Sequence, residues 1–227
     1  MSVPPSGSTA VTRTRAVGPV LSVVAGCAAL VALLGVAVST DFGPLLRLDR
    51  TVSEALYAGD DRSAALDVLL EVLTAPGLSV VRYALAVPVL VWLVRRRDWR
   101  TVLWVVVTAV FVRHLTSALK EFFDRVRPDF AEGGAGYETL SFPSGHSSGI
   151  ATLVVMGLVL AWPHLSAAGR RRSAVIGAGL VLLVGLTRMW LGVHYLSDVV
   201  AGWALGVGWT LLTAVVLGVL PVVRRTP

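Results

Sequence analysis

Two histidines stand in surroundings that nucleophilic and acid–base chemistry require. His194 precedes Asp198 by four residues, so on a helix the two side chains project from one face. A carboxylate bonded to one imidazole nitrogen fixes the tautomer and leaves the lone pair of the other nitrogen pointing outward. His194 is therefore a candidate nucleophile. His146, the last residue of the segment PSGH, is a candidate general acid for the leaving oxygen.

A second set of residues is suited to hold an anion. Lys120, the only lysine of the chain, precedes Arg127 by seven residues, and Arg188 lies in a third polar segment. Cations with little acid among them are stable together when an anion compensates them, and a phosphate matches guanidinium geometry. Ser144 and Gly145 stand at a predicted helix start, where unpaired N–H groups and the helix dipole bind anions. We predict a phosphate cradle built on this helix.

The composition places these residues in a membrane protein. Hydrophobic residues make up 55% of the 227-residue chain and charged residues 15%, where soluble domains have about 25% charged residues. A spanning helix needs about 20 mostly apolar residues. We predict an all-α, six-transmembrane helical bundle with spans at about 17–39, 78–95, 101–122, 147–162, 173–190 and 196–220. The mixed stretch at 41–77 is predicted to be an amphipathic segment at the interface.

The distribution of arginine predicts the orientation. The arginines at 13 and 15, 95–97, 170–172 and 224–225 fall on one side of the predicted bundle, and nearly every acid falls on the other. Positive loops face the cytoplasm, so both termini are expected there: a disordered tail at 1–15, one domain at 16–221 and a tail at 222–227. The net charge of +6 then reflects topology and anionic lipid heads, with no need for nucleic acid. The three polar segments, at 120–128, 143–146 and 187–198, are therefore expected on the outer face.

The order and spacing of these segments resemble the three-part signature of type 2 phosphatidic acid phosphatases. The matching parts are KEFFDRVRP, PSGH and TRMWLGVHYLSD; the threonine at 187 replaces the usual serine. The resemblance implies a multi-pass cell-membrane enzyme that needs no metal or other cofactor and forms a phosphohistidine. It also implies that His194 is the nucleophile, Asp198 its orienting partner and His146 the acid. The implied phosphate-binding residues are Lys120, Arg127, Ser144, Gly145 and Arg188.

Three functions are compatible with this pattern. The leading one is hydrolysis of a phosphate monoester or pyrophosphate of a membrane lipid. A phosphotransferase would use the same site, with another alcohol in place of water. A non-enzymatic anion channel or carrier is disfavoured because the polar residues crowd one face. Phosphatidic acid, phosphatidylglycerol phosphate, diacylglycerol pyrophosphate and polyprenyl pyrophosphate all remain candidate substrates, with a slight preference for the last.

Five further positions receive a structural interpretation. Arg113 lies inside the third span, two helical turns before Lys120, and is expected to face the bundle interior in a supporting role. Arg125 is expected to be solvated. Cys27 is expected to pack between helices rather than carry a lipid. The small-residue pair Gly202 and Gly206 is expected to pack within the bundle.

Overall fold

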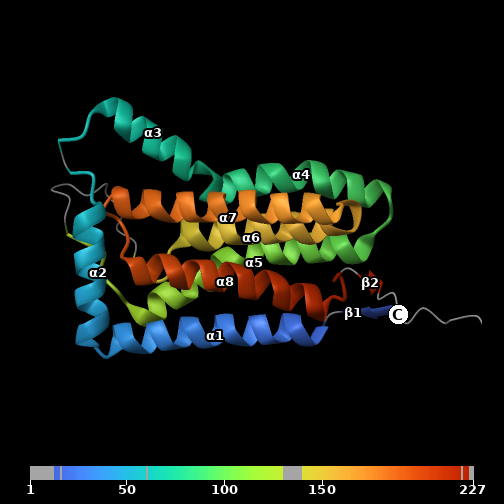
Figure 1. The fold of residues 1–227 in the computed structure, drawn as a ribbon, viewed down its shortest axis with the longest axis horizontal. Helices are drawn as coiled ribbons and strands as arrows, with labels where there is room; N and C mark the ends of the chain where they lie inside the picture. The colour runs from blue at the N-terminus through green and yellow to red at the C-terminus, as the bar shows by residue number, and fades with distance from the viewer. Residues whose placement is uncertain (1–12, 16, 60, 130–139, 221, 225–227) are drawn as a thin grey trace, which may run out of the picture.

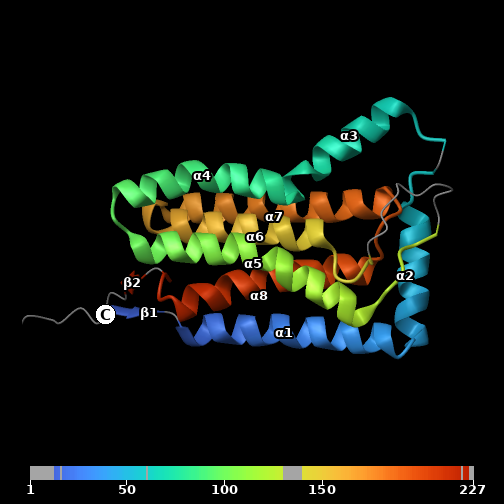
Figure 2. The ribbon, with the colours of Figure 1, turned by 180° about the vertical axis from the view of Figure 1, so that it is seen from behind.

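A computed structural model describes residues 13–15, 17–59, 61–129, 140–220 and 222–224. Long helices lie side by side in it, and one shorter helix, α2, crosses their ends (Figures 1 and 2). The α-helices are α1 (Val17–Ser39), α2 (Gly43–Leu56), α3 (Ala64–Thr74), α4 (Ser79–Arg95), α5 (Trp99–Phe123), α6 (Gly145–Ala161), α7 (Ala167–Trp190) and α8 (Leu196–Val216). Two 3₁₀ turns, η1 (Ala75–Gly77) and η2 (Trp162–His164), follow α3 and α6.

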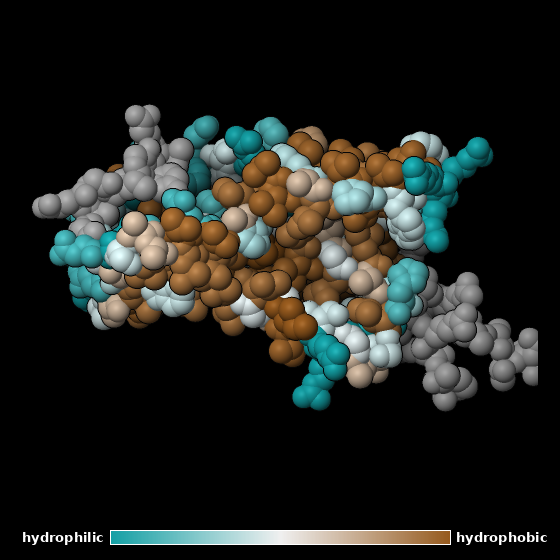
Figure 3. Space-filling model, turned by 90° about the horizontal axis from the view of Figure 1, so that it is seen from above, coloured by the Kyte–Doolittle hydropathy of each residue, from teal (hydrophilic) through white to brown (hydrophobic). Residues whose placement is uncertain are grey.

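The helices account for the predicted spans. Within the described ranges, α1, α5, α6 with η2, α7 and α8 are each long and apolar enough to cross a bilayer. A sixth span is formed if α3 with η1 and α4 together count as one broken span, bent by 47°. Most of the molecular face in Figure 3 is hydrophobic, and hydrophilic residues gather toward its two ends. The predicted six-span, all-α fold class is confirmed.

The second span differs from the prediction in its extent. α4 alone has 17 residues, about 25 Å of helix, which is short of the roughly 30 Å hydrocarbon core. Pro76 and Gly77 interrupt the helix before it, because proline cannot continue the hydrogen-bond ladder. A Cβ on Gly77 would lie 2.8 Å from the carbonyl oxygen of His146. The bend therefore brings this span directly against the PSGH segment.

α2 is the amphipathic element that the sequence predicts. It lies across the ends of α1, α5, α7 and α8 (Figures 1 and 2), and Pro44 in its first turn suits a helix start. Its polar residues Asp49 and Ser53 are fully buried, whereas Phe42 and Leu48 are exposed. The face of α2 that meets the bundle thus combines these two polar residues with half-buried apolar ones such as Leu45, and its outer face carries charged residues such as Arg47 and Glu54.

α8 and α6 form the centre of the bundle through close backbone contact. A Cβ on Gly202 would lie 2.6 Å from the carbonyl oxygen of Ser144, and one on Gly206 would lie 2.4 Å from that of Ser148. Only glycine permits this approach. The N–H of Ser144 also donates to the carbonyl oxygen of Asp198 at 2.9 Å. The predicted packing of the glycine pair within the bundle is confirmed, and it holds the starts of α6 and α8 together.

The chain ends of the described structure meet at the opposite end from α2. Strand β1 (Arg13–Arg15) pairs antiparallel with β2 (Val222–Arg224), with Thr14 opposite Val223. Both segments therefore lie at one end of the bundle (Figure 1). Three residues of each predicted tail are strand rather than disordered chain, and residues 1–12 and 225–227 lie outside the described residues.

Candidate active site

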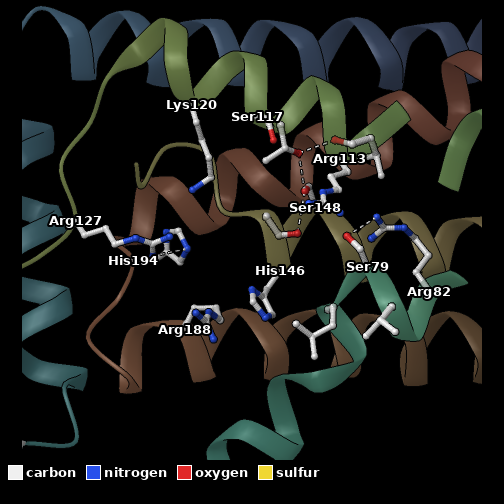
Figure 4. Close-up of a pocket in the computed structure, with 16 residues that line it drawn as sticks. Ser79, Arg82, Arg113, Ser117, Lys120, Arg127, His146, Ser148, Arg188 and His194 are labelled. Atoms are coloured by element: carbon white, nitrogen blue, oxygen red, sulfur yellow. Dashed lines mark hydrogen bonds between the residues drawn. The ribbon is translucent and has the colours of Figure 1, made fainter. Parts of the chain in front are cut away.

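Three segments distant in the sequence line one cavity of about 420 Å³. Six of the eight predicted site residues contribute to its wall: Lys120, Arg127, Gly145, His146, Arg188 and His194. Figure 4 shows them converging from α5, the chain after it, α6, α7 and the turn before α8. The other two, Ser144 and Asp198, are fully buried beside these residues. The structure thus brings the predicted residues together, while their roles remain predictions.

The start of α6 forms the floor of the site. Ser144 is the N-cap of α6, and its hydroxyl oxygen accepts a hydrogen bond from the N–H of Ser147 at 3.4 Å. This caps one orphan donor of the first turn and leaves Gly145 and His146 at the cavity wall. The Ser144 hydroxyl is turned toward its own helix and away from the cavity lining. We therefore assign it the task of shaping the cradle.

His194 is held between a carboxylate and a guanidinium. Its Nδ1 lies 3.3 Å from Oδ2 of Asp198, and its Nε2 lies 3.2 Å from Nη1 of Arg127. Arginine can only donate, so Nε2 accepts and the proton sits on Nδ1, facing Asp198. The same Oδ2 accepts the N–H of Tyr195 at 2.9 Å, which fixes the carboxylate. This is the tautomer and orientation that leave Nε2 available as a nucleophile.

Three cations surround that nitrogen. Lys120 and Arg188 each lie in the last turn of a helix, where the dipole favours positive charge. Lys120 donates to the carbonyl oxygen of Leu140, and Nη1 of Arg127 donates to that of Val193 at 2.7 Å. Arg188 donates to the hydroxyl of Thr74 at 3.5 Å. We call Lys120, Arg127 and Arg188 the phosphate-site cations, because each presents donors to the same cavity.

The surroundings of His194 change its proton affinity. Burial lowers the pKa of His194 well below its ordinary value, and the charges of Arg127, Arg188 and Lys120 lower it further. A histidine with a lowered pKa stays neutral, and therefore nucleophilic, as the pH falls below about 6.5. The nucleophile is lost only when the pH passes the lowered pKa.

This shift predicts the pH profile. The acid limb of kcat/KM should lie well below pH 6.5, and it should move to higher pH in Arg127→Gln, which removes one repulsive charge. Lipid phosphates also titrate near pH ~6, but they do so equally in both proteins. Wild type and Arg127→Gln are therefore compared by the pH at which the acid limb of kcat/KM falls, and not by the maximum value of kcat/KM. An unmoved limb would show that Arg127 does not set the proton affinity of His194.

A buried network behind His194 was not predicted. Nη1 of Arg125 donates to Oδ1 of Asp198 and to Oγ of Ser197, and Nη2 donates to Oδ2 of Asp49, each at 2.7 Å. Asp49 also accepts the N–H of Ser197 at 2.8 Å. We call Asp49, Arg125 and Asp198 the aspartate–arginine network. It links α2 to the carboxylate that orients the histidine.

The prediction that Arg125 is solvated is wrong. Arg125 is 9% exposed and stacks on the ring of Tyr195, with 4.2 Å from its guanidinium carbon to the ring centroid. The reason is α2, which crosses the end of the bundle and covers a residue that the linear sequence places in an open loop. The carboxylates of Asp49 and Asp198 and the hydroxyl of Ser197 accept its hydrogen bonds and compensate the buried charge.

Two more arginines reach the cavity from the α4–α5 side. Arg113 lines the cavity, and its side chain is exposed there rather than buried in the bundle interior. Arg82 of α4 is 1% exposed and donates to the carbonyl oxygen of Ala109 and to Oγ of Ser79, both at 3.1 Å. Arg82 was not among the predicted site residues, although an ionisable residue inside a span is a signal for a functional position.

The fold and the cavity define a helical membrane protein with a cationic, histidine-containing pocket. The chain belongs to the PAP2 superfamily, whose sequence profile matches residues 98–219. The resemblance seen in the three motifs is thereby confirmed. Among the described residues, no group of three or more histidine, cysteine, aspartate or glutamate side chains is arranged to hold a metal ion.

Curated relatives of this family are named as lipid phosphatases. The chain is 38% identical over 113 residues to phosphatidylglycerophosphatase B of Bacillus subtilis. The matched region covers 49% of this chain and 55% of that protein. It is 38% identical over 120 residues to lipid A 1-phosphatase of Rhizobium johnstonii, and the match covers 48% of this chain and 45% of that protein. It is 34% identical over 116 residues to decaprenylphosphoryl-5-phosphoribose phosphatase of Mycobacterium tuberculosis (49% and 57%). The matches thus span about half the length of these relatives.

Solved structures share more of the chain. The transmembrane PAP2-type phosphatidylglycerolphosphate phosphatase of Bacillus subtilis superposes with a TM-score of 0.65 at 28% identity, covering 82% of this chain and 93% of that one. LpxE of Aquifex aeolicus superposes with a TM-score of 0.54 at 23% identity, covering 73% and 94%. The latter supports the fold alone. The former places this chain among multi-span membrane proteins.

Proposed function

We propose that this protein is a membrane phosphatase that removes a phosphate group from a lipid through a phosphohistidine. The observation that carries the proposal is the geometry of His194. Its Nδ1 is held by Asp198 while its Nε2 faces a cavity that also contains His146 and the phosphate-site cations. The named activities of the relatives point the same way.

The first half of the reaction transfers the phosphoryl group to the protein. Arg127 turns from Nε2 to a phosphate oxygen, and the Nε2 lone pair forms a bond to phosphorus. The bond between phosphorus and the leaving oxygen breaks, and that oxygen takes a proton that His146 acquires together with the substrate, because the charge of the bound phosphate offsets the surrounding cations. The phosphate-site cations and the start of α6 stabilise the charge that develops on the equatorial oxygens, which is the largest expected contribution to the rate.

The second half releases inorganic phosphate. His146, now neutral, accepts a proton from a water molecule as the water oxygen bonds to phosphorus. The P–N bond breaks and its electron pair returns to Nε2, which restores His194. No step requires a metal ion in this scheme, since the cations of the chain supply the charge. Water is the acceptor here; an alcohol in its place would give the phosphotransferase reaction.

The proposed orientation lets a lipid reach this site. Both termini and the arginine-rich loops would face the cytoplasm, with residues 16–221 as one domain and the cavity at the outer face. The cavity is lined by α4 and α5, whose other residues form part of the apolar exterior. A lipid can therefore keep its tail in the bilayer while its phosphate reaches His194.

The test is phosphate release by the purified protein in detergent micelles, with a metal chelator present. The four substrates are phosphatidic acid, phosphatidylglycerophosphate, diacylglycerol pyrophosphate and a polyprenyl pyrophosphate. We expect hydrolysis of at least one of them, undiminished by the chelator. Glycerol added as a competing acceptor separates hydrolysis from transfer. The absence of phosphate release and of transfer from all four lipids would overturn the proposal.

A further inference from the structure

The cavity extends beyond the residues that the proposed reaction uses. Arg127, His194 and Arg188 lie on one side of it, with His146 and Ser148 in the middle (Figure 4). The far side contains Arg82 and Arg113, together with the hydroxyl groups of Ser79 and Ser117 (Figure 4). We call these four residues the α4–α5 subsite. It has cationic and hydroxyl donors but takes no part in the phosphoryl transfer described above.

Arg82 is fixed in place for this role. Two of its donors are engaged, Nε by the carbonyl oxygen of Ala109 and Nη2 by Oγ of Ser79. Nη1 lies close to Gly149, where a Cβ would come within 2.7 Å of it. Neither partner is a carboxylate, and Tyr83, whose ring centroid lies 5.4 Å from the guanidinium carbon, gives this side chain, which is 1% exposed, an aromatic contact. An uncompensated buried cation is costly unless an anion accompanies it.

Arg113 shows the same lack of an acidic partner. It lies in the middle part of α5, near enough to Arg82 for the two charges to repel each other. In the described part of the chain no acidic residue lines this cavity. A cation within a membrane span normally faces an acid or a water-filled path. Because Arg113 lines a cavity that contains other cations and no acid among the described residues, the cavity favours a ligand with negative charge.

The phosphoryl site does not supply that charge. The aspartate–arginine network carries one more negative charge than positive. Together with a phosphate monoester of charge about −2, it offsets the three phosphate-site cations, and the proton on His146 stays unbalanced. Arg82 and Arg113 remain in excess even when the phosphate to be hydrolysed is bound. A second anionic group on the same ligand would balance them.

The position of Arg113 shows where that second group lies. α5 ends at Phe123, on the side of the bundle where α2 crosses it. Arg113 precedes Lys120 by seven residues, so it lies about 10 Å further from that end. This is the direction in which the tail of a bound lipid extends. The second group must therefore lie between the hydrolysed phosphate and the tail.

We propose that the α4–α5 subsite binds a second phosphate group that the substrate carries between its hydrolysed phosphate and its lipid tail. This inference rests on the proposed function and specifies its substrate class. Lipids with only a terminal monoester leave the subsite empty. The spacing along α5 suits a phosphodiester separated from the hydrolysed phosphate by several bonds better than a directly attached one.

The test compares three lipids with identical dioleoyl tails. Phosphatidic acid has one phosphate, diacylglycerol pyrophosphate has a second one directly attached, and phosphatidylglycerophosphate has a second one separated by glycerol. In Arg113→Gln, the ratio of kcat/KM for phosphatidylglycerophosphate to that for phosphatidic acid should fall about tenfold or more, because a charge-assisted hydrogen bond is lost. The change should appear mainly in KM, and Arg113→Lys should restore part of it.

The matched control is Arg100→Gln. It removes one exposed arginine from the first turn of the same helix, outside the cavity lining, and should leave both the ratio and the activity unchanged. A fall that also affects the pyrophosphate would place a directly attached phosphate within reach of Arg113 and would still support the subsite. An equal change for all three lipids in Arg113→Gln would overturn the inference. Wild-type protein that acts on none of these three lipids, nor on a polyprenyl pyrophosphate, would instead overturn the proposed function.

Discussion

His194→Asn is expected to lower the rate of phosphate release on the order of 10⁴-fold, with little change in the protein's stability. Removing the attacking group of a catalytic constellation has effects of this size. Asparagine retains a donor that can bond to Asp198 but has no nucleophilic nitrogen. The measurement is the initial rate of phosphate release, together with quenching in alkaline detergent, in which a phosphohistidine is stable, to trap the phosphorylated protein. Wild type should carry acid-labile phosphate on residue 194, and the variant should carry none.

His114→Asn is the matched control for this experiment. His114 is an exposed histidine of α5 outside the cavity lining, and its Nδ1 lies 3.2 Å from the carbonyl oxygen of Val110. Its replacement should leave the rate within about twofold of wild type. If His194→Asn kept its activity while the cavity still bound the lipid, the phosphohistidine mechanism would have to be abandoned.

Arg125→Met is expected to cost about 3–5 kcal/mol of unfolding free energy and most of the activity. The substitution preserves much of the side-chain volume but leaves Asp49 and Asp198 buried without their shared cation. Removing one partner of a buried ion pair typically has this cost, since a charge is left uncompensated. Thermal unfolding in detergent measures the first effect, and phosphate release measures the second.

A second substitution tests the network itself. In Asp49→Asn/Arg125→Met one of the two stranded carboxylates becomes neutral, so part of the lost stability should return, and the two changes should not add. Arg50→Met, which removes the exposed arginine beside Asp49, is the control and should have little effect on stability. If Arg125→Met had the same free energy of unfolding as Arg50→Met, the aspartate–arginine network would not contribute to the stability of the fold.

The phosphoryl site was predictable because its residues lie in compact motifs. Gly145 and His146 share one helix start, and His194 stands two residues before α8 while Asp198 lies in its first turn, so local spacing already brings each pair together. The boundaries of the spans then bring the segments to one end of the bundle. Lys120 and Arg188 fall in the last turns of α5 and α7 for the same reason.

The supporting residues could not be predicted because their partners are far apart in the chain. Asp49 and Arg125 are separated by 76 positions, and nothing in either segment indicates that α2 crosses the bundle end where Arg125 emerges. The break at Pro76 and Gly77 is a local signal, but its effect on Arg82 depends on how η1 packs against α6. These are properties of tertiary packing rather than of any motif.

The position of α2 has a mechanical consequence for the reaction. This helix crosses the ends of the spanning helices at the proposed outer surface, yet its Asp49 bonds to the guanidinium that holds Asp198 in place. Any tilt of α2 is therefore transmitted through two salt bridges to the imidazole ring. Lipid head groups that press on or lift this helix would change the orientation of the His194 imidazole relative to the bound phosphate. Turnover should accordingly depend on lateral pressure in the surrounding leaflet as well as on substrate concentration.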